Sequence, residues 1–440
     1  MFYSRTIPIS IVPSLNFPTG EIPLQNLNKE QASFLWYQLL IKVLKRIPST
    51  SVSHNDLLTK CRLEHSNNNI KLGEIQEFED TYNSDNVIAW YTRDAFLYRL
   101  INKALKEKDI IVMYKFRFVL IDLHDRLVQL HGAYINSLKS HESTISELVV
   151  FHGQGLTLTE LQNLKGNIKG RISMNSFLVA STSREIALLS AGNGSGRQVV
   201  ESVFFEIHCP IMNYFTKPFA HIQQYSYSKT KDEILFSIGT VFHLAFVETL
   251  TDQLWHVKLI LCNNENDVNL NGPVDNLKSY IENAPEISIL TDLLLSMNEI
   301  DKVKHFNYMI LKDLPFDHCD RIHVQKNIGK ICLFEGNYSA ALKHFKQALQ
   351  ISRKLRPQDF SSISSIMNNI GYVYKELCNY SQSIKYHRKA LQIQKNILIN
   401  NDFELATTYS NLGVVHMCLS NYQLALNYHG KPNKFESIVL

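Results

Sequence analysis

The spacing of apolar residues divides the chain into four stretches. Residues 1–30 contain Pro, Asn and Ser with little periodicity and are expected to be a loose or partly extended lead-in. From Gln31 to about Ala133 apolar residues recur at steps of three and four, which predicts amphipathic helices. After Ser146 short runs rich in β-branched and aromatic residues predict strands. Helical spacing returns beyond Glu282.

The extended stretch is expected to hold several strands and one short helix. The helix is predicted at about Ser183–Ser190. Helices followed by strands indicate an α+β domain rather than a wound α/β sheet. The predicted strands are Val149–Phe151, Ile172–Leu178, Val203–Ile207, Ile234–Phe236, Val241–Val247 and Trp255–Leu261.

The last third of the chain repeats itself with a period of 42 residues. Gly329, Gly371 and Gly413 share this spacing, and so do three Asn-Tyr pairs that begin at 337, 379 and 421. A fixed period in this range predicts a solenoid built from helix pairs. Each Asn stands where the second helix should begin and is a good N-cap. Because glycine inside a helix costs about 1 kcal/mol relative to alanine, three glycines at one phase predict close approach of two helices.

These repeats resemble the tetratricopeptide family in its 42-residue form, similar to kinesin light chains. Pro432 falls where Ala348 and Ala390 stand, so the last repeat is expected to be incomplete. The resemblance implies a groove that binds a protein partner. The expected segments are a linker with a degenerate helical repeat at 266–320 and a repeat region at 321–440, with repeats at 321–362, 363–404 and 405–430.

Composition narrows the classes of function. A net charge of +4 over 440 residues, with scattered lysines and arginines, argues against a nucleic-acid partner. No apolar run approaches the roughly 20 residues that span a bilayer, so no membrane partner is expected. Seven cysteines without a Cys-x-x-Cys pair favour a reducing compartment and no metal site. With no signal-peptide pattern at the N-terminus, a cytoplasmic location is expected.

Three sequence blocks between Val149 and Leu261 carry a second resemblance. They are Val-Val-Phe-His-Gly-Gln-Gly at 149–155, Ser-Phe-Leu-Val-Ala-Ser-Thr-Ser at 176–183 and Asp-Glu-Ile-Leu-Phe-Ser-Ile-Gly at 232–239. Their order and spacing resemble the NAD-binding half of the mono-ADP-ribosyltransferases, the arginine-specific branch in particular. The resemblance implies a domain over 31–265 with a helical first half and a two-sheet second half. It also implies NAD or NADP as substrate.

The resemblance assigns roles to four residues. In the family, a glutamate stabilises the cationic sugar that forms as the nicotinamide–ribose bond breaks, and Glu233 occupies its position. Gly153 and Gln154 match the glycine that holds the carboxamide and its neighbour. Ser181 is the one serine in register with the family's Ser-Thr-Ser triplet, and a literal Ser-Thr-Ser begins two residues late. Glu233 is therefore the predicted catalytic residue, and Gly153, Gln154 and Ser181 are predicted to bind the cofactor.

Three positions depart from the family's pattern. His152 replaces the phosphate-binding arginine, Val179 replaces the first serine, and Lys231 replaces the glutamate that acts on the acceptor. A neutral histidine holds a phosphate less firmly than arginine. Lys231 would share a face with Glu233 in an extended segment and can pair with it, but it cannot act as a base toward a guanidinium at neutral pH.

The departures leave the reaction open. One hypothesis is a transferase of altered acceptor preference, in which the repeats recruit the protein acceptor. A second is NAD hydrolysis, which needs Glu233 but not the other glutamate. A third is a catalytically silent member that acts as a protein-binding scaffold. Tyr225 and Tyr227 precede Glu233 and either contact an acceptor or pack.

Overall fold

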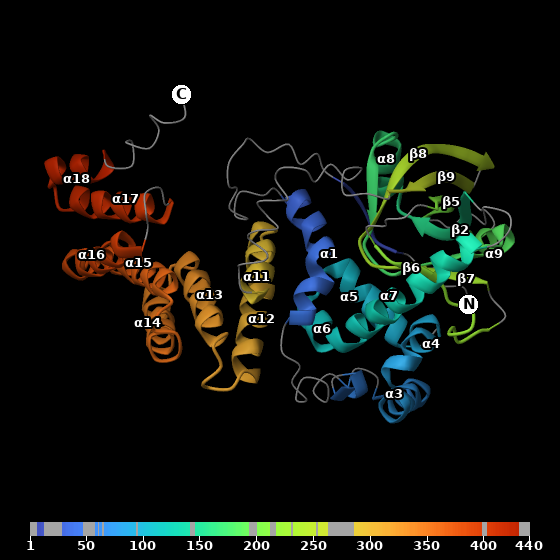
Figure 1. Ribbon diagram of the computed structural model, residues 1–440, viewed down its shortest axis with the longest axis horizontal. Coiled ribbons are helices and arrows are strands. Elements are labelled where there is room, and N and C mark those ends of the chain that lie inside the picture. The colour runs from blue at the N-terminus through green and yellow to red at the C-terminus, as the bar shows by residue number, and fades with distance from the viewer. Residues whose placement is uncertain are drawn as a thin grey trace. The chain divides into compact units, whose positions relative to one another are not determined.

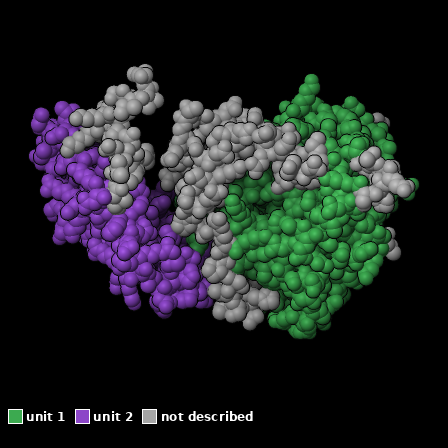
Figure 2. All heavy atoms as spheres, viewed as in Figure 1, with its two compact units in different colours: residues 1–302 green, residues 303–440 purple. Residues whose placement is uncertain are grey.

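The structure is a computed structural model of all 440 residues, and it divides into two compact units, residues 1–302 and 303–440 (Figures 1 and 2). No helix among the described residues is long and apolar enough to cross a membrane. The described residues are 7–12, 29–46, 58–59, 61–63, 66–93, 96–140, 146–192, 200–211, 217–229, 232–251, 254–262, 286–397 and 403–430.

After the short strand β1 (Ile9–Ile11), the first half of the first unit is helical, as predicted. Their apolar faces meet in an aromatic core, in which the ring of Phe78 lies 5.2 Å from Trp90 and 5.7 Å from Phe96. Late in the unit, α11 (Glu286–Ser296) packs against α1. The N-terminal helices are α1 (Lys29–Arg46), α3 (Asn69–Thr81), α4 (Val87–Thr92), α5 (Phe96–Glu107), α6 (Ile110–Lys115) and α7 (Arg117–Ser140), with a 3₁₀ turn, η2 (Ser84–Asn86).

A curled, mixed sheet of nine strands follows the helices (Figure 1). Its strand order is β1-β3-β8-β9-β5-β2-β4-β7-β6, and only β5 and β9 run parallel. The strands are β1 (Ile9–Ile11), β2 (Glu147–Leu156), β3 (Arg171–Met174), β4 (Leu178–Ser181), β5 (Glu201–Pro210), β6 (Phe219–His221), β7 (Glu233–Phe236), β8 (Thr240–Thr251) and β9 (Leu254–Leu261).

The resemblance implied two sheets, whereas the described strands form one. The reason lies at β2, which pairs with β5 along its whole length and with β4 at a single register position, Phe151 opposite Ser181. This one position joins the six strands from β1 to β2 to the three strands β4, β7 and β6. The junction lets the sheet curl without breaking.

Several local predictions were wrong. The strand predicted at Ile172–Leu178 is divided into β3 and β4, because the residues between them bond elsewhere. The Asn175 N–H donates to the Pro8 carbonyl (2.8 Å), and the Phe177 carbonyl accepts from the Tyr91 hydroxyl (3.0 Å). The prediction of a single helix among the strands missed α8 (Leu158–Gly166).

Helix α8 had a readable signal. Thr157 and Glu160 form a capping box, in which each side chain accepts from the other residue's backbone N–H. The predicted helix at 183–190 is α9 (Arg184–Ala191), with Ser183 as its N-cap. Part of the lead-in expected to be loose or partly extended, β1, pairs with β3.

The second unit consists of helix pairs with one recurring turn. Gly336, Cys378 and Ser420 stand 42 residues apart, and each adopts a positive φ of 56–74° between the two helices of its pair. Asn298 has the same conformation and lies between α11 and the helix that follows. The helices are α12 (Ile300–Asp313), α13 (Arg321–Phe334), α14 (Tyr338–Leu355), α15 (Phe360–Glu376), α16 (Tyr380–Ile397), α17 (Phe403–Cys418) and α18 (Tyr422–His429).

The repeated glycines lie where the two helices of a pair meet, which confirms the predicted close approach. A Cβ atom on Gly329 would lie 2.7 Å from the Phe345 ring, and one on Gly371 would lie 2.8 Å from the His387 ring. Gly413 meets His429 in the same way. Each ring stands 16 residues after its glycine.

We expect Gly371→Ala to destabilise the repeats by about 1–3 kcal/mol, because the added methyl group overlaps a buried ring. Gly73→Ala is the matched control, since Gly73 is helical and has no atom within 4 Å of its added Cβ. That substitution should be neutral or stabilising by up to about 1 kcal/mol. Thermal unfolding followed by circular dichroism measures both changes. Equal behaviour of the two variants would contradict the packing account.

The repeats should also lose stability in mild acid. Burial lowers the pKa of His387 to about 4, and burial likewise lowers that of His323 to about 4. The unfolded chain therefore binds protons more readily, and stability falls as the pH drops from about 6.5 toward 4. The slope should be at most about 1.4 kcal/mol per pH unit for each histidine. Hydrogen exchange of residues 321–430 at several pH values measures it.

His387→Phe provides the control for this pH dependence. The first repeat already carries a phenylalanine, Phe345, at the equivalent position against its own glycine. The variant removes one titrating ring and its hydrogen bond to Asn368, while it keeps an aromatic ring against Gly371. Its slope should be smaller than that of the wild type, and an unchanged slope would show that His387 does not cause the acid sensitivity.

Candidate functional site

Two of the predicted site residues are direct neighbours in the sheet. Ser181 on β4 lies opposite Glu233 on β7, and on its other side it lies opposite Phe151 on β2. Antiparallel partners point to the same face with their Cβ atoms roughly 5 Å apart. Ser181 and Glu233 are each 5% exposed. The structure therefore brings the predicted catalytic carboxylate and the predicted supporting hydroxyl together in one buried row.

The Glu233 carboxylate is held by the loop that precedes its strand. The Ser226 hydroxyl donates to Glu233 Oε2 at 2.7 Å, and Ser226 is itself buried. A turn fixes this serine, because its N–H donates to the Ile222 carbonyl at 2.8 Å. Ser226 was not predicted from the sequence. Only the fold brings it to the glutamate, and no spacing rule marks it.

The three hydroxyls of Ser181-Thr182-Ser183 have different tasks. Ser181 Oγ accepts from the Ser183 N–H at 3.1 Å, which turns the chain at the end of β4. The Ser183 side chain accepts from the Ile186 N–H and caps α9. Thr182 donates to the Asp232 carboxylate. The triplet thus connects the strand that carries Ser181 both to α9 and to the residue before Glu233.

Asp232 is fixed from two sides. Its carboxylate accepts from Thr182 and also pairs with His221 Nε2 on β6. Burial alone would raise the pKa of Asp232, but these hydrogen bonds and the nearby imidazole outweigh burial and hold the pKa below its usual range. The chain immediately before Glu233 is therefore anchored by an ionised side chain.

His152 lies on the other side of β2. Successive strand residues alternate in direction, so the His152 side chain points away from the face that carries Phe151, Ser181 and Glu233. Its Nδ1 atom lies 2.9 Å from the Val179 carbonyl oxygen, and Nε2 lies 3.3 Å from Gln154 Oε1. The ring thus bridges β2 and β4 close to their single paired position. This contact gives His152 a structural role.

Gln154 also has structural partners. Its Oε1 atom accepts from the Ile7 N–H at 2.7 Å, and its side-chain amide donates to the Ile7 carbonyl at 3.4 Å. The residue is fully buried. Gln154 therefore holds the segment that leads into β1 against the centre of the sheet.

Gly153 is required by the close approach of α9. A Cβ atom at this position would lie 1.9 Å from the Ala187 carbonyl oxygen and 2.5 Å from the Ala191 nitrogen. These are backbone atoms, which cannot rotate away as a side chain can. The helix covers the same face of β2 that leads to Ser181 and Glu233.

The two remaining departures from the family's pattern are Val179 and Lys231. Val179 is buried in β4 opposite Leu235 and offers its carbonyl to His152, so its apolar side chain brings no hydroxyl to the site. Lys231 lies outside the described residues, and so does its predicted pairing with Glu233.

Aromatic residues on the loop between β6 and β7 contact arginines of the helical region. The Arg93 guanidinium lies 5.2 Å from the Tyr227 ring and 5.1 Å from the Trp90 ring, and it pairs with Glu77 at 2.7 Å. The Tyr227 N–H donates to the Thr92 hydroxyl at 2.9 Å. The loop that carries Ser226 is thereby attached to the end of α4. Tyr225 lies similarly against Arg126, at 5.0 Å.

Arg184 brings positive charge to the face that carries Glu233. It is the first residue of α9, it is exposed, and its guanidinium lies 5.4 Å from the Phe204 ring. Phe204 stacks on Phe151 at 5.6 Å and lies opposite Gly153. Arg184 was not among the predicted site residues, although it directly follows the Ser-Thr-Ser triplet.

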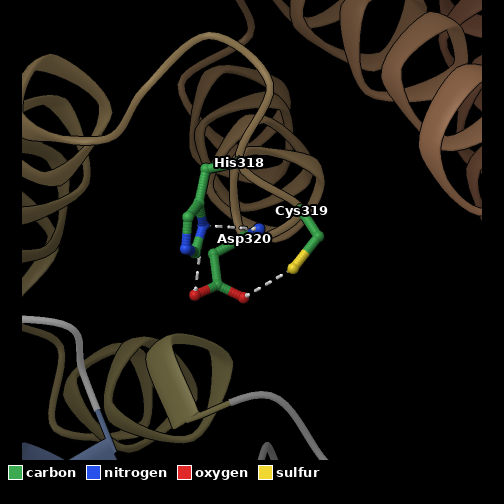
Figure 3. Close-up of side chains that lie close together, drawn as sticks. All are labelled: His318, Cys319 and Asp320. Atoms are coloured by element: carbon green, nitrogen blue, oxygen red, sulfur yellow. Dashed lines mark hydrogen bonds and ion pairs between the residues drawn. The ribbon is translucent and has the colours of Figure 1, made fainter.

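The second unit contains one further cluster of polar side chains. Among the described residues, His318, Cys319 and Asp320 are the group whose ligand atoms lie within 4.8 Å of one another, as a metal ion would need (Figure 3). The Asp320 N–H donates to His318 Nδ1 at 3.2 Å. The Arg356 guanidinium donates to Cys319 Sγ at 3.1 Å and places a positive charge beside the cluster. We therefore assign no metal to it.

Comparison with protein families identifies the repeats. Two family models described as tetratricopeptide repeat match residues 326–355 and 362–431. The C-terminal part of the chain therefore contains tetratricopeptide repeats. The chain matches no curated protein.

Solved structures give distant similarities. BtubC (BKLC) from P. vanneervenii is 17% identical over 40% of this chain and 76% of its own, with a TM-score of 0.33. A putative kinesin light chain with nearly identical TPR-like repeats, from Podosopora anserina, is 12% identical over 40% and 90% (TM-score 0.30). Plx2a, an ADP-ribosyltransferase toxin from Paenibacillus larvae, is 14% identical over 42% and 87% (TM-score 0.30). TM-scores this low assign no function to the chain.

The structural role of His152 can be tested against Arg184. We expect His152→Ala to lower the free energy of unfolding by about 1–3 kcal/mol, because it leaves buried polar groups at the β2–β4 junction without their partner. Arg184→Ala should change it by less than about 0.5 kcal/mol, because Arg184 is exposed. Urea unfolding of both variants measures the difference. A stable His152→Ala protein would remove the structural explanation for this histidine.

Proposed function

We propose that the first unit binds NAD or NADP and breaks its nicotinamide–ribose bond, while the tetratricopeptide repeats capture a protein that receives the ADP-ribose. The observation that carries this proposal is the buried cross-strand pair of Ser181 and Glu233, with Ser226 donating to the carboxylate. It is supported by the sequence blocks at 149–155, 176–183 and 232–239, which resemble the mono-ADP-ribosyltransferases.

Glu233 would act by electrostatic stabilisation. Loss of nicotinamide leaves positive charge on the ribose ring, and a carboxylate held against that ring lowers the energy of the transition state. The hydrogen bond from Ser226 fixes the direction of the carboxylate before substrate arrives. Asp232, anchored by Thr182 and His221, fixes the backbone next to it.

The residues on this face partly fit a dinucleotide. A pyrophosphate needs cationic partners, and Arg184 is an exposed guanidinium at the start of α9. We therefore assign phosphate binding to Arg184 in place of His152, whose ring bridges β2 and β4. Gly153 and Gln154 keep their predicted places in the sequence motif, but Gly153 lies against α9 and Gln154 bonds the backbone of Ile7.

The class of side chain that accepts ADP-ribose is inferred from the glutamate that is missing at position 231. Lys231 stands where the family has the glutamate that acts on a guanidinium, and lysine is no base toward arginine at neutral pH. Transfer to arginine is therefore the least supported outcome. A less basic side chain of a captured protein fits better, and water would make the protein an NAD hydrolase.

A catalytically silent scaffold is the second candidate. The observation that favours it is that His152, Gly153 and Gln154 all have structural contacts, so that three positions of the family's motif are occupied by the fold itself. In that case the repeats carry the function as a protein-binding surface.

Nicotinamide release from NAD by the full chain tests the proposal. We expect release by the wild type and a loss of at least about 100-fold in Glu233→Gln, because a neutral amide cannot stabilise the cationic sugar. Glu248→Gln, on an exposed strand position, is the matched control and should keep full activity. Arg184→Ala should raise KM with a smaller effect on kcat.

NAD that carries a label in its ADP-ribose part distinguishes transfer to protein from hydrolysis. Label on protein supports transfer, and free ADP-ribose supports hydrolysis. If the wild type releases no more nicotinamide than Glu233→Gln, the protein is a catalytically silent scaffold and NAD cleavage is excluded. Thermal unfolding of each variant shows whether a loss of activity comes from a loss of fold.

A further inference from the structure

The second helices of two successive repeats carry cations and no carboxylates. Neither α14 (Tyr338–Leu355) nor α16 (Tyr380–Ile397) contains Asp or Glu. Between residues 338 and 397 the chain has ten lysines and arginines against two acidic residues. An exposed helix surface usually mixes both signs, because oppositely charged neighbours four residues apart stabilise it. These two helices lack such pairs.

Five of the cations occupy one side of their helices, which we call the basic face. At 100° per residue they lie within an arc opposite the buried side chains of each helix, such as Phe345 on α14 and His387 on α16. All five are exposed. The basic face consists of Lys343, Lys346, Lys385, Arg388 and Lys389.

The pattern repeats with the array. Lys343 and Lys385 are 42 residues apart, and so are Lys346 and Arg388. Successive repeats therefore present the same charge at the same helical phase. In the linear sequence these residues are scattered, which is why the sequence analysis found no basic region.

Local structural roles do not account for these cations. Other basic residues do have such a role, since Arg353, Lys354 and Lys395 lie in the last turns of their helices, where positive charge stabilises the negative end of the helix dipole. The basic face lies before those turns. Lys346 approaches the Tyr374 ring at 5.5 Å. No described carboxylate forms an ion pair with any of the five.

Carboxylates on the neighbouring helices have other partners. Asp359 caps α15 by accepting from the Ser362 N–H. Glu376 pairs with Lys375 at 2.7 Å, and Glu335 pairs with Lys304 at 2.8 Å. The positive charge of the basic face is thus not neutralised by the elements packed against it.

We infer that the basic face binds a short acidic segment of a partner protein. Charge complementarity carries the assignment, because a row of unpaired cations attracts and orients an opposite row. The exposed positions that flank the cations on the same side of each helix are polar and uncharged, namely Ser339, Gln350, Ser381 and Gln392. They provide hydrogen bonds to a peptide, and none of the four offers an aromatic ring for a base or an apolar side chain for a bilayer, while the Tyr374 ring near Lys346 is half-buried.

The distribution of charge over the chain favours a short ligand over a long polyanion. Residues 303–440 hold 17 lysines and arginines against 9 acidic residues, whereas residues 1–302 hold 28 against 32. A nucleic acid or an anionic membrane extends well beyond one helical face, and the chain outside the repeats has no excess of positive charge to hold it. A short acidic segment can bind to the repeats alone.

The test measures binding of a fluorescein-labelled deca-glutamate peptide to the full chain by anisotropy. We expect binding that weakens at least about tenfold in the triple variant Lys343→Glu, Lys385→Glu, Arg388→Glu, and that also weakens between 50 and 200 mM salt. The matched control reverses three exposed lysines of the first unit, Lys42, Lys103 and Lys106, and should change affinity by less than about twofold. Circular dichroism confirms that both variants keep their helices.

Three results would overturn the inference. One is the absence of peptide binding at low salt, and another is an equal loss in the control variant. The third is tighter binding to a DNA duplex or to phosphatidylserine vesicles than to the peptide, which would assign the face to a different class of ligand. None of these results depends on NAD cleavage, so they leave the proposed activity of the first unit untouched.

Discussion

The arrangement of the candidate site depends on one backbone contact, the pairing of Phe151 with Ser181. It is the single register position that joins β2 to β4, and through it the six-stranded and three-stranded parts of the sheet become one. Ser181 in turn positions Glu233 on the next strand. His152 strengthens the junction by bonding the Val179 carbonyl where the strands separate. Without this contact Ser181 and Glu233 would stay paired with each other, but they would lie in a separate layer from Phe151 and Gly153 on β2.

This dependence explains the departure at His152 in physical terms. A side chain at this position points into the body of the sheet and is 6% exposed. A permanently charged guanidinium would need a buried counter-ion there, whereas a neutral imidazole needs none and donates from one ring nitrogen, to the Val179 carbonyl oxygen or to Gln154 Oε1. The position to which the sequence resemblance assigns a phosphate ligand holds two strands together in this structure. A structural role therefore explains the histidine at this position, whichever reaction the site supports.

Much of the architecture was predictable because it is periodic. The change from helical to extended spacing located the helices and most strands, and the glycines at 329, 371 and 413 predicted the contact between helices. The pairs Ser226–Glu233 and Gln154–Ile7 join residues by tertiary contacts that leave no local pattern. The division between β3 and β4 likewise depends on Pro8 and Tyr91, which lie far away in sequence. Among these features that were not predicted, α8 differs because its capping box is a local signal in the sequence.

The backbone contact between Gly153 and α9 has a mechanical consequence. Ala187 and Ala191 approach the glycine without any intervening side chain, so β2 and α9 form one stiff layer. Ser181 is part of this layer because α9 begins three residues after it. On its other side Glu233 contacts the loop that carries Ser226, and this loop is attached to the end of α4 by a threonine hydroxyl and a cation–π contact. Those contacts are few and lie near the surface, so they yield first. The two sides of Glu233 therefore differ in rigidity: β2 with α9 is the stiffer side, and the loop that carries Ser226 is the more deformable one.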